Sequence, residues 1–192
     1  MGRRDVVASL LQDRGDLLLV AGLGSTAWDV TAAGDTPLNF PLWGAMGNAA
    51  MFGLGLALAQ PKRRVLVLTG DGEMLMGVGS LATIGVQRPR NLSVVVIDNE
   101  RYGETGMQAT HTAAGVDLAR VALACGFRSA RMLRAPGQLA ALRRAIHSGQ
   151  GPLFAQVKVR AEKIPLVLPP REGALLKSRF RKALLGDGAD LD

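Results

Sequence analysis

Two short polar clusters in this 192-residue chain carry side chains that suit a metal-bound diphosphate. Gly70-Asp71-Gly72 directly follows one apolar run, and Asp98-Asn99 directly follows another. Carboxylate and amide oxygens are hard ligands of the kind that Mg²⁺ or Ca²⁺ prefers. The glycines that flank Asp71 let the backbone approach a bulky anion, and a helix that begins there favours a diphosphate.

The elements that must position these clusters are two strands joined by a helix. The apolar runs at 65–69 and 92–97 are typical of strands covered on both faces, and residues 73–87 have helical character. In a right-handed crossover between parallel strands, both carboxyl ends lie at the same edge of the sheet. We therefore expect Asp71 and Asn99 to converge at that edge, where the ligands of doubly wound sheets bind.

The rest of the chain repeats the alternation of strand and helix. We expect further strands at 16–21, 129–133 and 153–159, and further helices at 6–11, 48–60, 117–125 and 138–147. This order predicts an α/β protein with a doubly wound, mostly parallel sheet in three layers. We expect residues 1–164 to form one domain, on which residues 165–192 pack as a Pro-rich link and a basic helix.

Composition and charge narrow the class of protein. No apolar run approaches the roughly 20 residues that span a bilayer, and the N-terminus lacks the apolar block of a signal peptide. We therefore expect a cytoplasmic protein with no membrane association. A lone cysteine, Cys125, excludes an internal disulfide and a cysteine-ligated cluster. The net charge of +7 comes without interleaved aromatics or a recognition motif, so we expect no nucleic-acid partner.

Taken together, the two polar clusters resemble the signature of thiamine-diphosphate-dependent enzymes, in which Gly-Asp-Gly is followed, after one helix and one strand, by Asn-Asn. The resemblance implies the thiamine-diphosphate-binding fold. It also implies that Asp71 and Asn99 give side-chain oxygens to Mg²⁺ and that Arg101 gives its backbone carbonyl. Gly70 and Gly72 then lie against the diphosphate.

Two residues depart from that signature. Asp98 stands where the first Asn of the pair is usual, at a position that does not normally hold the metal. Glu73 stands where Ser, Ala or Cys commonly lies beside the diphosphate. A carboxylate at residue 73 either repels the diphosphate or turns away from it.

The segment Trp43-Gly44-Ala45-Met46-Gly47 resembles a loop of the decarboxylase and acetolactate-synthase branch of these enzymes. The resemblance implies that Met46 props the cofactor in its bent conformation. The backbone amide of Met46 and the carbonyl of Gly44, on either side of Ala45, then bond the aminopyrimidine. From residue type alone, Met46 suits a core position equally well.

The segment from Tyr102 to Gln108 and the Thr110-His111 pair resemble the loop after the metal site in sulfopyruvate decarboxylase β subunits and in phosphonopyruvate decarboxylases. The resemblance implies that Tyr102 and Gly103 contact the cofactor and that the loop helps to form the substrate pocket. Glu104 and His111 are the candidate catalytic residues. The alternatives are an exposed loop carboxylate and a surface histidine.

The resemblance also implies that this chain holds half of an active site. In these enzymes a glutamate from a pyrimidine-binding domain protonates the aminopyrimidine ring, and the chain offers a single α/β unit. We expect that glutamate to come from a separate α subunit, in an α/β hetero-oligomer with β–β contacts. The implied function is decarboxylation of a small anionic 2-oxo acid such as sulfopyruvate, with release of an aldehyde.

Other functions stay open at this point. Phosphonopyruvate decarboxylases and acetolactate-synthase-type carboligases share the same motifs, and detection of an aldehyde or of a new carbon–carbon bond separates the two reactions. The β subunits of 2-oxoacid:ferredoxin oxidoreductases commonly carry cysteines for an iron–sulfur cluster, which the lone Cys125 disfavours. A non-catalytic cofactor-binding protein is an alternative of another class, and Glu73 favours it.

Overall fold

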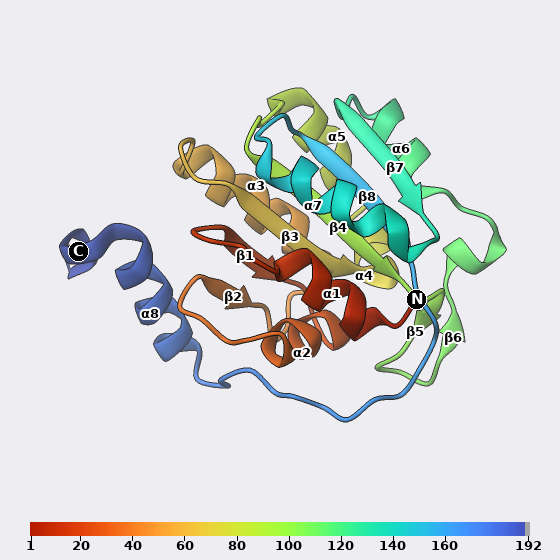
Figure 1. Cartoon of the computed structure of the whole chain (residues 1–192), viewed down its shortest axis with the longest axis horizontal. Helices are drawn as coiled ribbons and strands as arrows, with labels where there is room; N and C mark the ends of the chain where they lie inside the picture. The colour runs from red at the N-terminus through yellow and green to blue at the C-terminus, as the bar shows by residue number, and fades with distance from the viewer. Residues whose placement is uncertain (191–192) are drawn as a thin grey trace.

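A six-stranded sheet forms the centre of the molecule in the computed structural model, which describes residues 1–190 (Figure 1). Every pair of neighbouring strands is parallel, in the order β2-β1-β3-β4-β8-β7. These strands are β1 Leu18–Ala21, β2 Asn39–Pro41, β3 Val65–Gly70, β4 Leu92–Asp98, β7 Ser129–Leu133 and β8 Leu153–Lys158. The prediction of an α/β protein with a doubly wound parallel sheet is confirmed.

Helices cover both faces of the sheet, which gives the three predicted layers (Figure 1). Successive strand residues point to opposite faces: Leu66 and Leu68 pack with one helical layer, and Val65 and Val67 with the other. The first layer contains α1 Arg3–Leu11, α2 Ser25–Ala32 and α7 Leu139–His147. The second contains α3 Ala49–Ala59, α4 Asp71–Met76, α5 Ser80–Gln87, α6 Leu118–Ala124 and α8 Gly173–Leu185.

The strand order reverses between β1 and β3. The chain leaves β1 to form β2 on one side, and β3 lies on the other side of β1. The crevice outside the carboxyl ends at such a reversal is where ligands of open α/β sheets bind. The turn after β1, beginning at Gly22, and the segment Gly70–Glu73 after β3 both lie there.

The helix expected at residues 73–87 is interrupted, so that part of the prediction is wrong. Two helices, α4 and α5, replace it, and the chain turns at Gly77 between them. A Cβ on Gly77 would lie 2.0 Å from the backbone oxygen of Gly47. Only a glycine permits this approach of two backbones, so the break brings α4 against the loop that carries Met46.

Several short elements lack a sequence signal and were not expected. The edge strand β2 has three residues and ends in Pro41, which gives no alternating pattern. A small antiparallel hairpin, β5 Arg101–Tyr102 and β6 Gln108–Ala109, follows β4. The 3₁₀ segments are η1 His111–Ala114, η2 Pro136–Gln138 and η3 Gly186–Asp190.

The C-terminal segment returns along the molecule to the edge of the sheet. From the end of β8 an extended link passes α2 and leads to α8, which lies beside β2 (Figure 1). The rings of Phe180 and Phe40 meet edge to face at 5.2 Å, and Arg179 donates to both carboxylate oxygens of Asp35 at 2.6 and 2.8 Å. The division at residue 164 stays a prediction, and residues 191–192 lie outside the described part.

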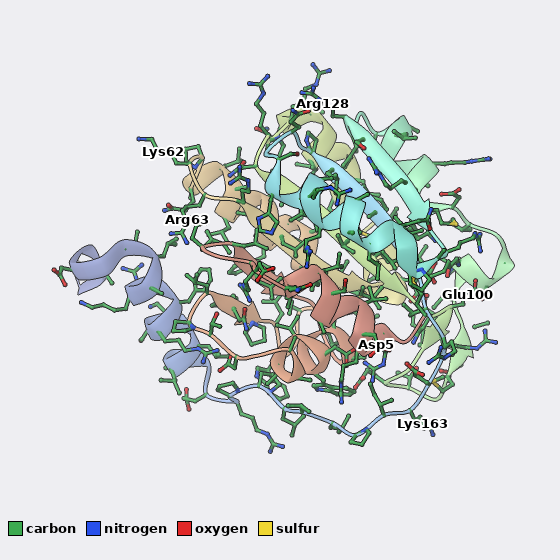
Figure 2. The ribbon with its side chains drawn as sticks, viewed as in Figure 1. Asp5, Lys62, Arg63, Glu100, Arg128 and Lys163 are labelled. Carbon is green, nitrogen blue, oxygen red and sulfur yellow. The ribbon has the colours of Figure 1, made fainter. Side chains whose placement is uncertain are left out.

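Part of the positive charge lies far from the carboxyl ends of the strands. Lys62 and Arg63 precede β3 and Arg128 precedes β7, and Figure 2 shows all three at the opposite end of the sheet from Glu100. These cations therefore do not surround the predicted diphosphate site. Within residues 1–190, no helix has the length and apolar character needed to cross a membrane.

Candidate active site

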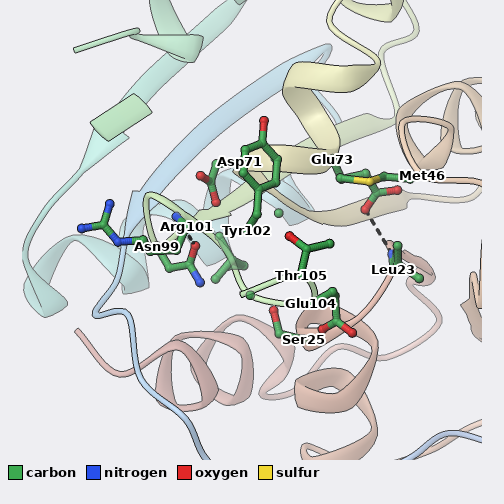
Figure 3. Close-up of a pocket in the computed structure, with 14 residues that line it drawn as sticks. Leu23, Ser25, Met46, Asp71, Glu73, Asn99, Arg101, Tyr102, Glu104 and Thr105 are labelled. Atoms are coloured by element: carbon green, nitrogen blue, oxygen red, sulfur yellow. Dashed lines mark hydrogen bonds between the residues drawn. The ribbon is translucent and has the colours of Figure 1, made fainter. Parts of the chain in front are cut away.

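A cavity of about 160 Å³ opens at the reversal of strand order, beside the carboxyl ends of β1, β3 and β4 (Figure 3). Segments far apart in the sequence meet around it, as the strand topology requires. Its lining residues are Leu23, Ser25, Met46, Gly70, Asp71, Gly72, Glu73, Ile97, Asn99, Arg101, Tyr102, Gly103, Glu104 and Thr105. The cavity therefore collects most of the predicted site residues.

The three predicted metal ligands line this cavity together. Asp71 is almost completely buried, and the amide oxygen of Asn99 accepts a hydrogen bond from the backbone N–H of Arg101 at 2.9 Å. An amide oxygen has two lone pairs, so this bond leaves Asn99 one for a cation. Between Asn99 and Arg101, Glu100 has a left-handed φ of 62°, a strained conformation that is frequent at functional sites.

The ionisation of Asp71 reflects its burial. Desolvation raises the pKa of Asp71 to about 6, and the nearby charge of Asp98 adds to the rise. Hydrogen bonds from Thr110 and from the backbone amides of Asp71 and Asn99 act in the opposite direction. Within residues 1–190, no cationic side chain is among the groups that shift this pKa.

Within residues 1–190, no three His, Cys, Asp or Glu side chains gather in an arrangement that could hold a metal ion. A cation at Asp71 would depend instead on amide, carbonyl and ligand oxygens. Mg²⁺ is commonly bound in this way, by one or two carboxylates together with phosphate oxygens and water.

The side chain of Glu73 turns toward the turn after β1 (Figure 3). Its Oε2 accepts hydrogen bonds from the backbone N–H of Leu23 at 3.1 Å and from the hydroxyl of Thr69 at 2.9 Å. Its Oε1 is buried without a hydrogen-bond partner among the described residues. Desolvation raises the pKa of Glu73, and the hydrogen bonds from Thr69 and from the backbone amide of Leu23 oppose the rise. The carboxylate of Glu73 is thus held by Leu23 and Thr69, which corresponds to the alternative in which the side chain turns away from the diphosphate position.

The loop before α3 presents Met46 to the cavity. Ala45 has a left-handed φ of 57° and Gly47 one of 87°, so the backbone turns sharply on both sides of Met46. Gly44 and Ala45 are exposed, and nothing lies within 4 Å of the position that a Cβ on Gly44 would take. The loop is therefore open around Gly44, whereas the carbonyls of Ala45 and Met46 accept hydrogen bonds from Asn48.

Tyr102 packs closely on the diphosphate motif. A Cβ on Gly72 would lie 2.4 Å from the ring of Tyr102, so any larger residue at position 72 would displace the ring. Gly103 is exposed in the same loop. Gly70 has open space on the side where a Cβ would point, which leaves room for a bound anion.

The two candidate catalytic residues line different cavities. Glu104 lines the first cavity and leans over Gly24, where a Cβ would lie 2.7 Å from its Oε1. Desolvation raises the pKa of Glu104, and the charge of Arg3 opposes this. His111 is exposed and lines a neighbouring cavity of about 450 Å³, which shares Met46 and Tyr102 with the first.

Some of the residues at the site were not predicted from the sequence. Leu23 and Ser25 line the cavity because β1 borders the reversal of strand order, and the Gly-rich turn after a core strand is the signal that could have found them. Thr110 donates to Asp71 from the segment after β6, and the hydroxyl of Thr112 lies close to the same carboxylate oxygen. Nothing in the sequence predicts which way that segment folds.

The fold and the cavity define a class of protein: α/β proteins with a ligand-sized cavity at a reversal of strand order. The model of the family "Thiamine pyrophosphate enzyme, C-terminal TPP binding domain" matches residues 24–157. The chain belongs to this family of thiamine pyrophosphate (thiamine diphosphate) enzymes. The resemblance inferred from the two polar clusters is thereby confirmed.

Individual relatives agree with this assignment. The chain is 37% identical to the sulfopyruvate decarboxylase subunit beta of Methanothermobacter thermautotrophicus, over 91% of each chain. It is 36% identical to the phosphonopyruvate decarboxylase of Streptomyces viridochromogenes, over 86% of this chain and 42% of that enzyme. The solved structure of benzoylformate decarboxylase from Polynucleobacter necessarius superposes with a TM-score of 0.69 at 20% identity, over 85% of this chain and 34% of that one, and supports the fold.

Proposed function

We propose that this chain is the thiamine-diphosphate- and Mg²⁺-binding subunit of a decarboxylase for a small anionic 2-oxo acid, of the sulfopyruvate type. The observation that carries the proposal is the placement of Asp71 and Asn99 at the adjacent ends of β3 and β4, around one cavity. This pair occurs in a chain that aligns along 91% of a sulfopyruvate decarboxylase β subunit.

The proposed roles follow from the groups around the cavity. The carboxylate of Asp71, the amide oxygen of Asn99 and the backbone carbonyl of Arg101 supply hard oxygens for Mg²⁺. Gly70 and Gly72 leave space for the diphosphate. When bound, thiamine diphosphate supplies the nucleophilic carbon and the electron sink for decarboxylation.

The neighbouring loops hold and enclose the other end of the cofactor in this proposal. The carbonyl of Gly44, an exposed residue, and the amide of Met46 bond the aminopyrimidine, and the Met46 side chain, which lines the cavity, supports it. Tyr102 and Gly103 form the adjoining wall. In this proposal Glu104 and His111, which line neighbouring cavities, contact the substrate or move a proton.

A partner subunit completes the site in this proposal. Helix α3 begins directly after the Met46 loop and contains no polar residue in its sequence AAMFGLGLALA. A helix that is apolar all round is typical of a buried position, yet Met51, Phe52 and Leu58 on α3 are substantially exposed. We infer that an α subunit with the pyrimidine-binding domain covers this surface, in a hetero-oligomer that also has β–β contacts.

The experiment that tests the function is a substrate comparison with the reconstituted α/β complex. Sulfopyruvate, phosphonopyruvate and pyruvate are offered with thiamine diphosphate and Mg²⁺, and carbon dioxide, aldehyde and carboligation products are measured. We expect aldehyde from sulfopyruvate and no product with Asp71→Ala. Faster turnover of phosphonopyruvate would favour a phosphonopyruvate decarboxylase as the second candidate function. The chain is 36% identical to one such enzyme. A carbon–carbon product would favour a carboligase, and no reaction with any of them would contradict the enzymatic proposal.

A further inference from the structure

Two threonine hydroxyls lie beside one oxygen of the Asp71 carboxylate. Thr110 donates to Oδ2 of Asp71 at 2.5 Å, and the hydroxyl of Thr112 lies 3.3 Å from the same oxygen. The two hydroxyl oxygens are 2.9 Å apart. All three side chains are buried, so water does not compete for these contacts.

Each hydroxyl has a single proton to donate. The shortest contacts assign the proton of Thr110 to Asp71, at 2.5 Å, and the proton of Thr112 to Asp98 Oδ1, at 2.8 Å. The pair therefore stands between two buried carboxylates, with one hydroxyl on each. With both protons used in this way, the 2.9 Å approach of the two hydroxyl oxygens is not itself a hydrogen bond.

Asp98 is held by partners on both of its oxygens. Its Oδ1 accepts from Thr112 and from the backbone N–H of Glu100 at 3.0 Å. Its Oδ2 accepts from Gln156 at 2.6 Å and pairs with the ammonium group of Lys158 at 2.7 Å. Asp98 is completely buried, so it is engaged as an internal anchor on β4, with its charge balanced from β8.

We propose that Thr110 is a positioning residue that orients the Asp71 carboxylate for the cation, beside Thr112, whose hydroxyl is committed to Asp98. A hydrogen bond to Oδ2 restrains the rotation of the carboxylate. The lone pairs that this bond leaves unused can then bind a cation in the cavity that Asp71 lines. Groups that orient a metal ligand commonly change metal affinity about 10- to 100-fold when they are removed. This inference rests on the proposed function, in which Asp71 binds Mg²⁺.

The test measures cation binding by titration calorimetry of the α/β complex with saturating thiamine diphosphate, using Mg²⁺ and Ca²⁺ separately. Thr110→Val removes the hydroxyl and keeps the shape, and we expect it to weaken Mg²⁺ binding about 10- to 100-fold. Ca²⁺ tolerates looser geometry than Mg²⁺, so the Mg²⁺ preference over Ca²⁺ falls as well. Thr110→Ser keeps the hydroxyl, so we expect wild-type Mg²⁺ affinity and wild-type preference for Mg²⁺ over Ca²⁺.

Controls separate this inference from a packing effect and from the proposed function. Thr31→Val makes the same change on α2, where the hydroxyl bonds the Ala27 carbonyl, and leaves cation binding unchanged. If Thr110→Val fails to fold, Thr110→Ala is measured in its place. Unchanged Mg²⁺ binding in Thr110→Val, or equal loss in Thr110→Ser, overturns the positioning role while Asp71→Ala still abolishes binding. Unchanged binding in Asp71→Ala overturns the proposed function itself.

Discussion

The carboxylate of Glu73 accepts a hydrogen bond from the backbone amide of Leu23 at 3.1 Å, which joins the segment after β3 to the turn after β1. These two segments border the reversal of strand order from opposite sides. The side chain that departs from the Ser, Ala or Cys implied by the family resemblance thus links the two halves of the crevice. It brings a buried negative charge into the wall of the cavity where a diphosphate is proposed to bind.

Glu73→Gln removes that charge and keeps an oxygen that can accept from Leu23 and Thr69. Because like charges repel more strongly in a buried site than in water, we expect thiamine diphosphate to bind roughly 3- to 10-fold more tightly to this variant, which corresponds to about 1 kcal/mol. Titration of the α/β complex with thiamine diphosphate at saturating Mg²⁺ measures the dissociation constant of the cofactor in the variant and in the wild type. Weaker binding than in the wild type would show that the carboxylate assists the cofactor.

Asp71 should make the stability of the cofactor-free protein depend on pH. Its folded pKa of about 6 lies above the ordinary value of 3.8, so the folded state binds this proton more tightly than the unfolded chain does. The resulting stabilisation is present at pH values below about 4 and is lost as the pH rises through about 6.

Asp71→Asn has nearly the same shape without the charge. We expect it to raise the free energy of unfolding by about 2 to 3 kcal/mol near pH 7.5 and by less than about 1 kcal/mol near pH 4. Urea denaturation of the cofactor-free chain at the two pH values measures the difference. A variant that is equally stable or less stable near pH 7.5 would contradict the assigned burial cost.

Asp98 and Lys158 should behave as a unit in folding. Lys158→Met leaves a completely buried carboxylate without its cation, and we expect a loss of about 3 kcal/mol of stability. Adding Asp98→Asn to Lys158→Met removes the unpaired charge and should recover most of that loss. A double-mutant cycle by denaturation measures the coupling, and two additive losses would show that the pair does not interact.

The exposed apolar face of α3 should be needed for assembly and not for folding. Met51→Glu and Leu58→Glu place charges at exposed positions, so we expect little change in the melting temperature of the isolated chain. Association with the α subunit should weaken by at least about 10-fold, the equivalent of 1.4 kcal/mol. Val86→Glu, on the exposed side of α5, is the matched control. Normal association of the α3 variants would place the partner elsewhere.

The sheet and the converging pair Asp71 and Asn99 could be predicted because they depend on local signals. Continuous apolar runs mark buried parallel strands, and the rule for crossovers places their carboxyl ends at one edge. The family motif then assigned metal-binding roles to Asp71 and Asn99, which were already expected to lie close together.

The remaining features depend on contacts between distant residues. The break at Gly77 arises from its close approach to Gly47, and no local pattern reports the position of another backbone. Arg3 resembles a solvated N-terminal charge in the sequence, yet it is buried and pairs with Asp29 at 2.7 Å. The contact of Thr110 with Asp71 likewise depends on how the chain folds back after β6.

The most direct test of the account is a calorimetric titration of thiamine diphosphate and Mg²⁺ into the chain, alone and together with its candidate α subunit. The account predicts binding that appears or tightens when the α subunit is present and that disappears in both Asp71→Ala and Asn99→Ala. Absence of binding in every combination, or binding that both variants retain, would contradict a metal-bridged diphosphate site at the ends of β3 and β4.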